Sequence, residues 1–197
     1  MAETIAPVVH GGRRGRYWTA VALHTLGATA AAGAVGLVLA AAGAGLGAPW
    51  GAAGLGALAL AAALYALRES VGLPVPVPDR HRQVPDWWRT FFAPRTAALL
   101  YGLGLGVGFL TFLTYGTFVV VAFAAFLSGD PALGFALCAP FGLARGLSVM
   151  VSAHTTGGEQ AAAVVDALER TAMGALPKAA NAAALGALAL AAALGVV

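Results

Sequence analysis

The sequence predicts an all-α fold: a polytopic bundle of about five transmembrane helices with one short cytoplasmic amphipathic helix. Composition is the first observation behind this, because 60% of the residues are hydrophobic and 10% are charged, whereas soluble domains carry about 25% charge. The second observation is that the regions 17–67 and 96–129 contain no Asp, Glu, Lys or Arg. The remaining polar connections are too short for a soluble domain, so we expect residues 1–197 to form a single integral membrane domain.

The first charge-free region predicts two spans, at about 17–45 and 51–67, around a turn that contains Pro49. An uncharged region of this length exceeds the apolar core of a cleaved signal peptide, which runs about 7–15 residues. Tyr17 and Trp50 would mark the two membrane interfaces, where amphipathic rings are enriched. We therefore expect the chain to cross the membrane twice before its first polar loop.

That loop, 68–95, is predicted to be cytoplasmic and to have two parts. Its first part, 72–78, alternates proline with other residues and should be extended, because proline lacks a backbone donor. The second part sets four aromatic residues around Arg89: Trp87, Trp88, Phe91 and Phe92. We favour an aromatic belt that anchors the next helix over a binding loop.

Three further spans are predicted, at about 96–127, 132–153 and 179–197. A second cytoplasmic loop, 154–178, should contain the amphipathic helix. The segment Thr156–Glu159 has the spacing of a capping box at the start of that helix. Apolar residues then recur at helical spacing on one face, so we expect this helix to rest on the bilayer.

Charge placement predicts the orientation. Ten of the eleven Lys and Arg residues lie before the first span or in the two polar loops. The positive-inside rule then places the N-terminus in the cytoplasm and the C-terminus outside, as expected for a bacterial inner-membrane protein.

Glycine takes every second position near the start of the third span. These glycines form two overlapping GxxxG patterns, which favour close helix packing, although a locally broken helix is the alternative. Pro140, in the fourth span, frees a backbone carbonyl and can bend that helix. The candidates for helix packing or a break are Gly102, Gly104, Gly106, Gly108 and Pro140.

Polar residues inside the spans suggest a solute path. On a continuous helix, Thr111, Thr114 and Tyr115 would share one face. Their hydroxyls either bond back to helix carbonyls or line a polar path. Arg145, the one basic residue within a predicted span, either snorkels to the interface or acts as a counter-ion beside Ser148. The main interpretation is a transporter-like protein that moves or binds a small solute, for which Arg145 would favour an anion.

Two alternatives stay open. One is a non-catalytic membrane subunit or assembly factor, whose glycine-rich faces dock a membrane-protein partner or a second copy. The other is a haem or quinone redox protein with His24 and His154 as weak haem ligands, although chance placement of the two histidines is favoured. No metal site, cofactor, hydrolase triad or nucleic-acid surface is predicted, and the expected partner is the lipid bilayer. We favour a protein that is not an enzyme.

An internal repeat is also visible. The ten residues Leu55–Leu64 recur identically at Leu185–Leu194. An inverted repeat of the kind found in transporters would need these two spans to run in opposite directions. Low complexity in an Ala-, Leu- and Gly-rich chain is the favoured explanation.

One stretch resembles a known group. The run Tyr101–Thr111, the turn Ser128–Pro131 and the Gly- and Arg-bearing helix that follows are similar to half of the CcdA/DsbD-type transmembrane proteins, over residues 96–152. That group belongs with the LysE-like exporters and implies inverted three-helix repeats. Its redox members carry a proline–cysteine pair at the break, where this chain has Thr111–Gly116 and no cysteine. Thiol–disulfide relay is therefore excluded.

Overall fold

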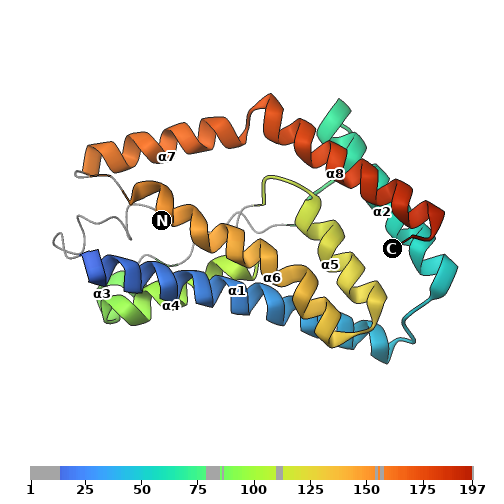
Figure 1. Ribbon diagram of the computed structural model, residues 1–197, viewed down its shortest axis with the longest axis horizontal. Helices are drawn as coiled ribbons and strands as arrows, with labels where there is room; N and C mark the ends of the chain where they lie inside the picture. The colour runs from blue at the N-terminus through green and yellow to red at the C-terminus, as the bar shows by residue number, and fades with distance from the viewer. Residues whose placement is uncertain are drawn as a thin grey trace. The chain divides into compact units, whose positions relative to one another are not determined.

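The protein is described by a computed structural model that covers residues 14–78, 85, 87–109, 113–153, 155 and 158–196. These residues form helices and no strand (Figure 1). Among the described residues, four helical segments are long and apolar enough to cross a membrane: Arg14–Gly45, Gly51–Val71, Pro131–Val151 and Ala175–Leu194. The predicted fold class, an all-α membrane helix bundle, is thereby confirmed.

The chain folds into two compact units. Unit 1 contains the first part of α1, the helices α3 and α4, the last part of α6, η3 and α7. Unit 2 contains the rest of α1 and α6, with α2, α5 and α8. The elements in chain order are α1 (Arg14–Gly45), α2 (Gly51–Val71), α3 (Trp88–Phe91), α4 (Pro94–Gly106), α5 (Thr117–Ser128), α6 (Pro131–Leu147), the 3-10 helix η3 (Ser148–Ser152), α7 (Gly158–Ala172) and α8 (Ala175–Leu194).

The predicted third span, 96–127, is divided between two helices. Its first half, α4, belongs to unit 1 and ends at Gly106, while its second half, α5, belongs to unit 2 and begins at Thr117. Gly108 has a φ of 71°, a left-handed conformation that glycine adopts without steric cost. Gly102, Gly104 and Gly106 stay within α4, and Gly108 suits the turn that follows it.

Helix α2 is longer than predicted. It was expected to end at 67, yet it continues through Arg68 and Glu69 to Val71. Gly72 then ends it in a left-handed conformation, with its N–H donated to the carbonyl of Arg68. The two charged residues stay helical because their side chains find partners within unit 2.

The last predicted boundaries also shift. The predicted fourth span, 132–153, is α6 followed by the short 3-10 helix η3, with Pro140 inside α6. Helix α8 begins at Ala175, earlier than the predicted start at 179, so Pro177 lies in its first turn, where proline costs little. Helix α7 is present where an amphipathic helix was predicted, but Thr156 of the proposed capping box lies outside the described residues.

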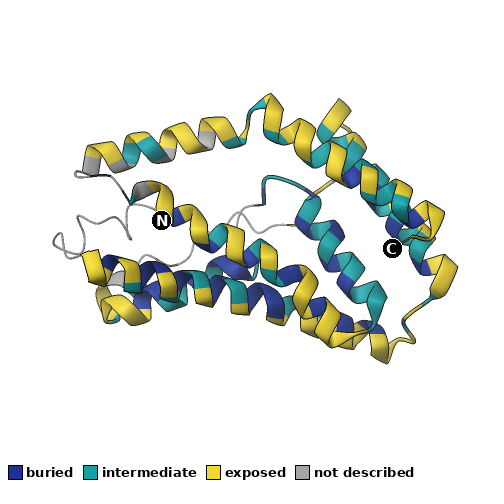
Figure 2. Ribbon diagram, viewed as in Figure 1, coloured by how far each residue is buried: buried dark blue, intermediate teal, exposed yellow. Residues whose placement is uncertain are grey.

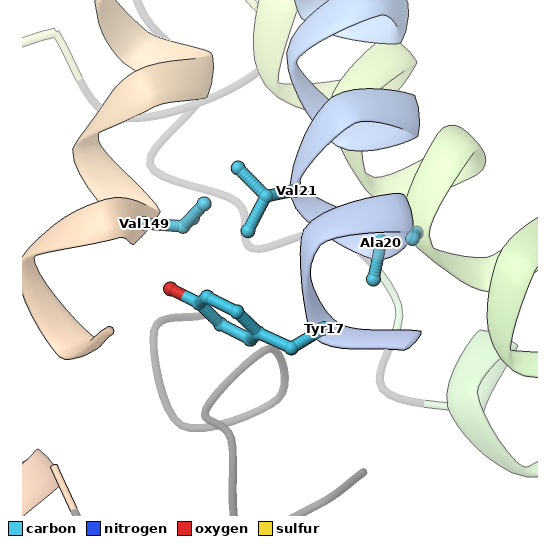
Figure 3. Packing of buried hydrophobic residues seen from close by; sticks show 5 residues of the cluster. Tyr17, Ala20, Val21 and Val149 are labelled. Atoms are coloured by element: carbon cyan, nitrogen blue, oxygen red, sulfur yellow. The ribbon is translucent and has the colours of Figure 1, made fainter. Parts of the chain in front are cut away.

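In unit 1, α1 and α4 lie side by side and run parallel, with glycine of α4 against backbone of α1. A Cβ atom built at Gly102 would meet the carbonyl of His24, and one at Gly106 would meet the carbonyl of Ala28. Small residues let membrane helices approach this closely. At the start of α1, Tyr17 packs with neighbouring apolar residues and with Val149 of η3 (Figure 3).

Helix α6 approaches α1 in the same way within unit 1. A Cβ atom at Gly142 would meet the carbonyl of Ala28, and one at Gly146 would meet Cα of Thr25. Helix α1 therefore contacts both α4 and α6 through positions where no larger residue fits. These glycines let the backbones of α4 and α6 approach that of α1 closely.

In unit 2, α2 and α8 pack on each other and on α5. Their shared core contains Leu58, Ala62, Val120, Leu185 and Ala192. Both copies of the repeated decapeptide supply residues to it, and the helices are antiparallel because the end of α2 and the start of α8 both contact the start of α5. Buried positions are few along α8, as Figure 2 shows, which suits a helix with one face in lipid.

Candidate functional site

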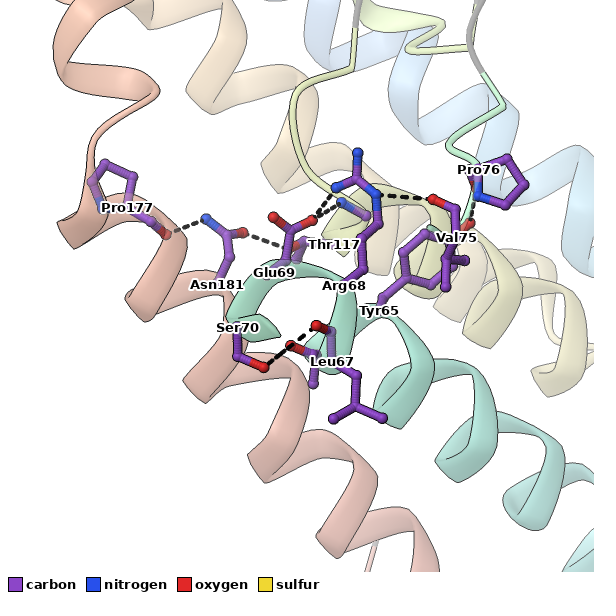
Figure 4. Close-up of polar contacts among 12 residues, drawn as sticks. Tyr65, Leu67, Arg68, Glu69, Ser70, Val75, Pro76, Thr117, Pro177 and Asn181 are labelled. Atoms are coloured by element: carbon purple, nitrogen blue, oxygen red, sulfur yellow. Dashed lines mark hydrogen bonds and ion pairs between the residues drawn. The ribbon is translucent and has the colours of Figure 1, made fainter. Parts of the chain in front are cut away.

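Several described polar side chains of unit 2 gather where α2 ends and where α5 and α8 begin. We call this group the polar cluster and define it by five residues, which Figure 4 shows: Tyr65, Arg68, Glu69, Thr117 and Asn181. A membrane helix carries such side chains only where they find partners, because an unpaired polar group in hydrocarbon is costly.

Glu69 is the centre of the polar cluster. Its side chain is only 4% exposed. One carboxylate oxygen, Oε1, accepts hydrogen bonds from the guanidinium of Arg68 and, at 3.2 Å, from the backbone N–H of Gly116. Gly116 is the residue at the N-cap of α5, where helix dipoles favour a negative charge. Glu69 thus satisfies an open backbone donor and neutralises Arg68 at the same time.

The segment after α2 is held back against the helix. Arg68 donates its Nε–H to the carbonyl of Val75 at 3.0 Å, and Tyr65 donates its hydroxyl to the carbonyl of Pro76 at 2.8 Å. The ring of Tyr65 also packs on Gly116, where an added Cβ atom would meet the ring directly. These contacts fix the proline-rich segment, which has no helical hydrogen bonds of its own.

The third part of the polar cluster joins α5 to α8. The hydroxyl of Thr117 donates to Oδ1 of Asn181, and Nδ2 of Asn181 donates to the carbonyl of Pro177 at 2.8 Å. Pro177 has no N–H of its own, and its carbonyl is used here by a side chain. The start of α5 is therefore fastened to both neighbouring helices, to α2 by Glu69 and to α8 by Asn181.

The predicted solute-path residues are divided between the two units, and the path that they would line stays a prediction. Thr111 lies outside the described residues, and Thr114 and Tyr115 lie in a non-helical segment before α5, so the predicted shared helix face is absent there. These two belong to unit 2, whereas Arg145 and Ser148 belong to unit 1. The prediction depended on a continuous helix, and that helix ends at Gly106, the last residue of α4.

In unit 1, Arg145 contacts protein groups. Its guanidinium donates to the carbonyl of Leu105 at 3.4 Å and lies 5.4 Å from the ring centre of Phe141. Ser148 donates its hydroxyl to the carbonyl of Arg145 at 2.7 Å, the back-bonding that is common for hydroxyls in helices. Arg145 thus holds the end of α4 near α6.

His24 is fully buried in unit 1, with 0% exposure. Its Nδ1 lies 3.3 Å from the carbonyl of Ala98, and since a carbonyl can only accept, Nδ1 carries the hydrogen. Nε2 makes no hydrogen bond to the described residues. His154 lies outside those residues, so the pairing proposed for a haem stays a prediction. In the described ranges, no group of three or more His, Cys, Asp or Glu could hold a metal ion.

Sequence reasoning missed Glu69 and Asn181. Glu69 was assigned to a loop because a charge normally ends a membrane span, and no weight was given to its place in the last turn of a helix. Asn181 lies near the start of the last predicted span, and a polar residue within such a span is itself a signal of a partner or a function. That signal could have identified it.

These features define a class: a helical protein of membrane type with an interrupted helix whose second half starts on a buried carboxylate. Comparison with known proteins finds no matching protein family model and no matching solved structure. It does find relatives named methylamine utilization protein MauF. Those from Methylophilus methylotrophus and Paracoccus versutus are 36% and 40% identical to this chain over 88 residues, and that from Paracoccus denitrificans is 36% identical over 89 residues.

The matched part covers 45% of this chain and 31–32% of each relative. The chain therefore matches about a third of the length of these relatives. The resemblance to CcdA/DsbD-type proteins and LysE-like exporters was wrong, because the relatives carry another name and no model of those groups matches. An alternating glycine run with a Ser-Gly-Asp-Pro turn describes any closely packed, interrupted membrane helix, and it does not distinguish between families.

Proposed function

We propose that this chain is a non-catalytic membrane accessory protein, such as an assembly factor, that serves methylamine utilisation. The observation that carries the proposal is the set of relatives named for methylamine utilization, at 36–40% identity. Of the interpretations made from the sequence, the subunit or assembly factor agrees best with that name. The transport interpretation finds no support in it.

The described polar contacts support the same choice. The N-terminus of an interrupted helix is a natural site for an anionic solute, but at α5 the chain's own Glu69 occupies that position. Arg145, the other candidate for an anion, donates to a backbone carbonyl. Both groups hold helices together, which is what a protein that presents a surface to a partner requires.

We also infer that the protein lies in the inner membrane with its N-terminus in the cytoplasm. The support is the asymmetry of Lys and Arg around the apolar helices. A reporter enzyme that is active only outside the cytoplasm, fused after Val196, should then be active. Activity of the same reporter fused after Arg170, in α7, would contradict the orientation.

Deletion of the gene in its host tests the function. We expect growth on methylamine to be lost and growth on an unrelated carbon and nitrogen source to be unchanged. Uptake of labelled methylamine by the deletion strain should equal that of the parent, because the proposed role follows entry of the substrate. Lost uptake would favour transport, and unchanged growth on methylamine would overturn the proposal. Complementation with the intact gene is the control.

A further inference from the structure

The short helix α3 has two faces, because its aromatic residues form two pairs spaced four residues apart. Trp88 and Phe92 pack against Tyr101 of α4 and its surroundings. Trp87 and Phe91 are left 55% and 80% exposed. One pair thus fixes the turn to unit 1, and the other presents two large rings to whatever surrounds the protein.

The exposed rings of Trp87 and Phe91 are supported by neighbouring aromatic rings. The ring centres of Trp87 and Phe91 are 6.0 Å apart, and those of Trp88 and Tyr101 are 5.8 Å apart, both with edge-on geometry. The hydroxyl of Tyr101 donates to the carbonyl of Pro85 at 3.2 Å, which ties the chain before α3 to α4. Rings held in this way lose little conformational freedom when they enter the headgroup region of a membrane.

Three exposed arginines lie near the starts of α1 and α4 in unit 1. Arg95 lies in the first turn of α4, and Arg14 and Arg16 lie at the start of α1. The starts of α1 and α4 are at the same end of unit 1, because Tyr17 and Ala98 share one core cluster. The sequences of α1, α3 and α4 contain no Asp or Glu. The described parts of these three helices therefore combine exposed aromatic rings with positive charge and no acidic residue.

We propose that this aromatic–arginine end of unit 1 docks on anionic phospholipid, and we define it by Trp87, Phe91, Arg95, Arg14 and Arg16. Aromatic rings favour the boundary between headgroups and acyl chains. Guanidinium groups bind phosphate through paired hydrogen bonds, and each cation near an anionic leaflet adds attraction. The inference does not depend on the proposed role in methylamine utilisation.

Charge distinguishes this end from helix α7, which also belongs to unit 1. Helix α7 carries three acidic residues and one basic residue, and it has no aromatic residue. Its net negative charge gives α7 no electrostatic attraction to an anionic leaflet, whereas the arginines near α3 would be attracted to one. A protein partner at α3 is the competing occupant, and its binding would not depend on the charge of the surrounding lipid.

Tryptophan quenching in vesicles tests the proposal on the full chain. In a variant with Trp18→Phe, Trp50→Phe and Trp88→Phe, only Trp87 emits, and Phe at 88 still packs on Tyr101. Vesicles contain phosphatidylcholine with a minority of phosphatidylglycerol, and one or the other lipid is brominated. Per brominated molecule, we expect phosphatidylglycerol to quench roughly two- to fivefold more strongly.

Matched controls come from the same chain. A variant that keeps only Trp50 places the emitter in unit 2 beside Phe126, far in sequence from any Lys or Arg, and should show no preference between the lipids. Arg95→Gln should reduce the preference of Trp87, and Asp166→Asn, in α7, should leave it unchanged. Added inorganic phosphate should not compete.

Equal quenching of Trp87 by the two lipids, or none by either, would overturn the proposal. Should the triple-tryptophan variant fail to fold, native mass spectrometry of the unmodified chain from mixed lipids provides a second measurement. More phosphatidylglycerol than phosphatidylcholine should stay bound, with a loss on Arg95→Gln. Equal retention of the two lipids would also overturn the proposal.

Discussion

The two halves of the interrupted helix are held by different forces. Helix α4 contacts α1 through glycine against backbone, at Gly102 and Gly106. Helix α5 starts on a polar cluster, where Glu69 and Asn181 supply side-chain acceptors. A backbone contact has no flexible group that can move aside, whereas a hydrogen-bonded contact can lose one partner and keep the others. We therefore expect substitutions in unit 1 to be more harmful than those in unit 2.

Gly102→Val should have the largest effect. The new side chain would meet the carbonyl, carbonyl carbon and Cα of His24, and overpacking against groups that cannot rotate away costs about 3 kcal/mol or more. Titration with a denaturing detergent, followed by circular dichroism, measures the loss in free energy of unfolding. The control is Gly56→Val in α2, where an added Cβ meets nothing within 4 Å. Equal effects at the two positions would show that the α1–α4 contact is not tight.

Glu69→Ala should come second. It removes an acceptor with a charged partner, leaves the N–H of Gly116 and the guanidinium of Arg68 without it, and should cost about 1.5–3 kcal/mol. The same unfolding titration applies, and Asp166→Ala, an exposed acid in α7, is the control with little change. Glu69→Gln should retain part of the stability, because an amide oxygen still accepts from Gly116. If Glu69→Ala is as mild as the control, the carboxylate does not hold α5.

The comparison also separates what sequence could predict from what it could not. The apolar runs predicted the helices and the all-α class. A charge-free stretch of this length is most stable in the hydrocarbon core of a membrane, where a helix satisfies its own backbone hydrogen bonds. The glycine run allowed two interpretations, close helix packing and a broken helix, and the structure has features of both. Gly102 and Gly106 contact α1, while Gly108 lies beyond the end of α4 with a positive φ. Local sequence does not decide between them, since only the neighbouring helix reveals how closely it approaches.

The polar cluster could not be predicted from the sequence, because its contacts depend on how the helices pack. Residues 69, 116 and 181 are distant in sequence, and their contact follows from the packing of α2, α5 and α8. The charge of Glu69 argued for a loop when it was considered alone. Within unit 2 the start of α5 supplies its partner, so burial becomes favourable. A buried charge in a membrane bundle is predictable only once its partner is known.

The hydrogen bond between Thr117 and Asn181 should contribute less than Glu69. Thr117→Val and Asn181→Leu should each cost about 1 kcal/mol, and the double variant should show a coupling near 0.6 kcal/mol, as is usual between membrane helices. A double-mutant cycle of unfolding titrations measures this coupling. Thr114→Val, in the non-helical segment before α5, serves as the neighbouring control. A coupling of zero would mean that α5 is held to α8 by apolar packing alone.

Tyr65→Phe should have the smallest effect and so test the lower limit of the comparison. The substitution removes the hydroxyl that donates to Pro76 but keeps the ring that packs on Gly116. Since this hydrogen bond is exposed, water can replace it, and the unfolding titration should change by less than about 0.5 kcal/mol. Tyr65→Ala, which also removes the ring, should cost several times more. Equal losses for Phe and Ala would assign the contribution of Tyr65 to its hydroxyl, and polar contacts would then dominate unit 2 even where water has access.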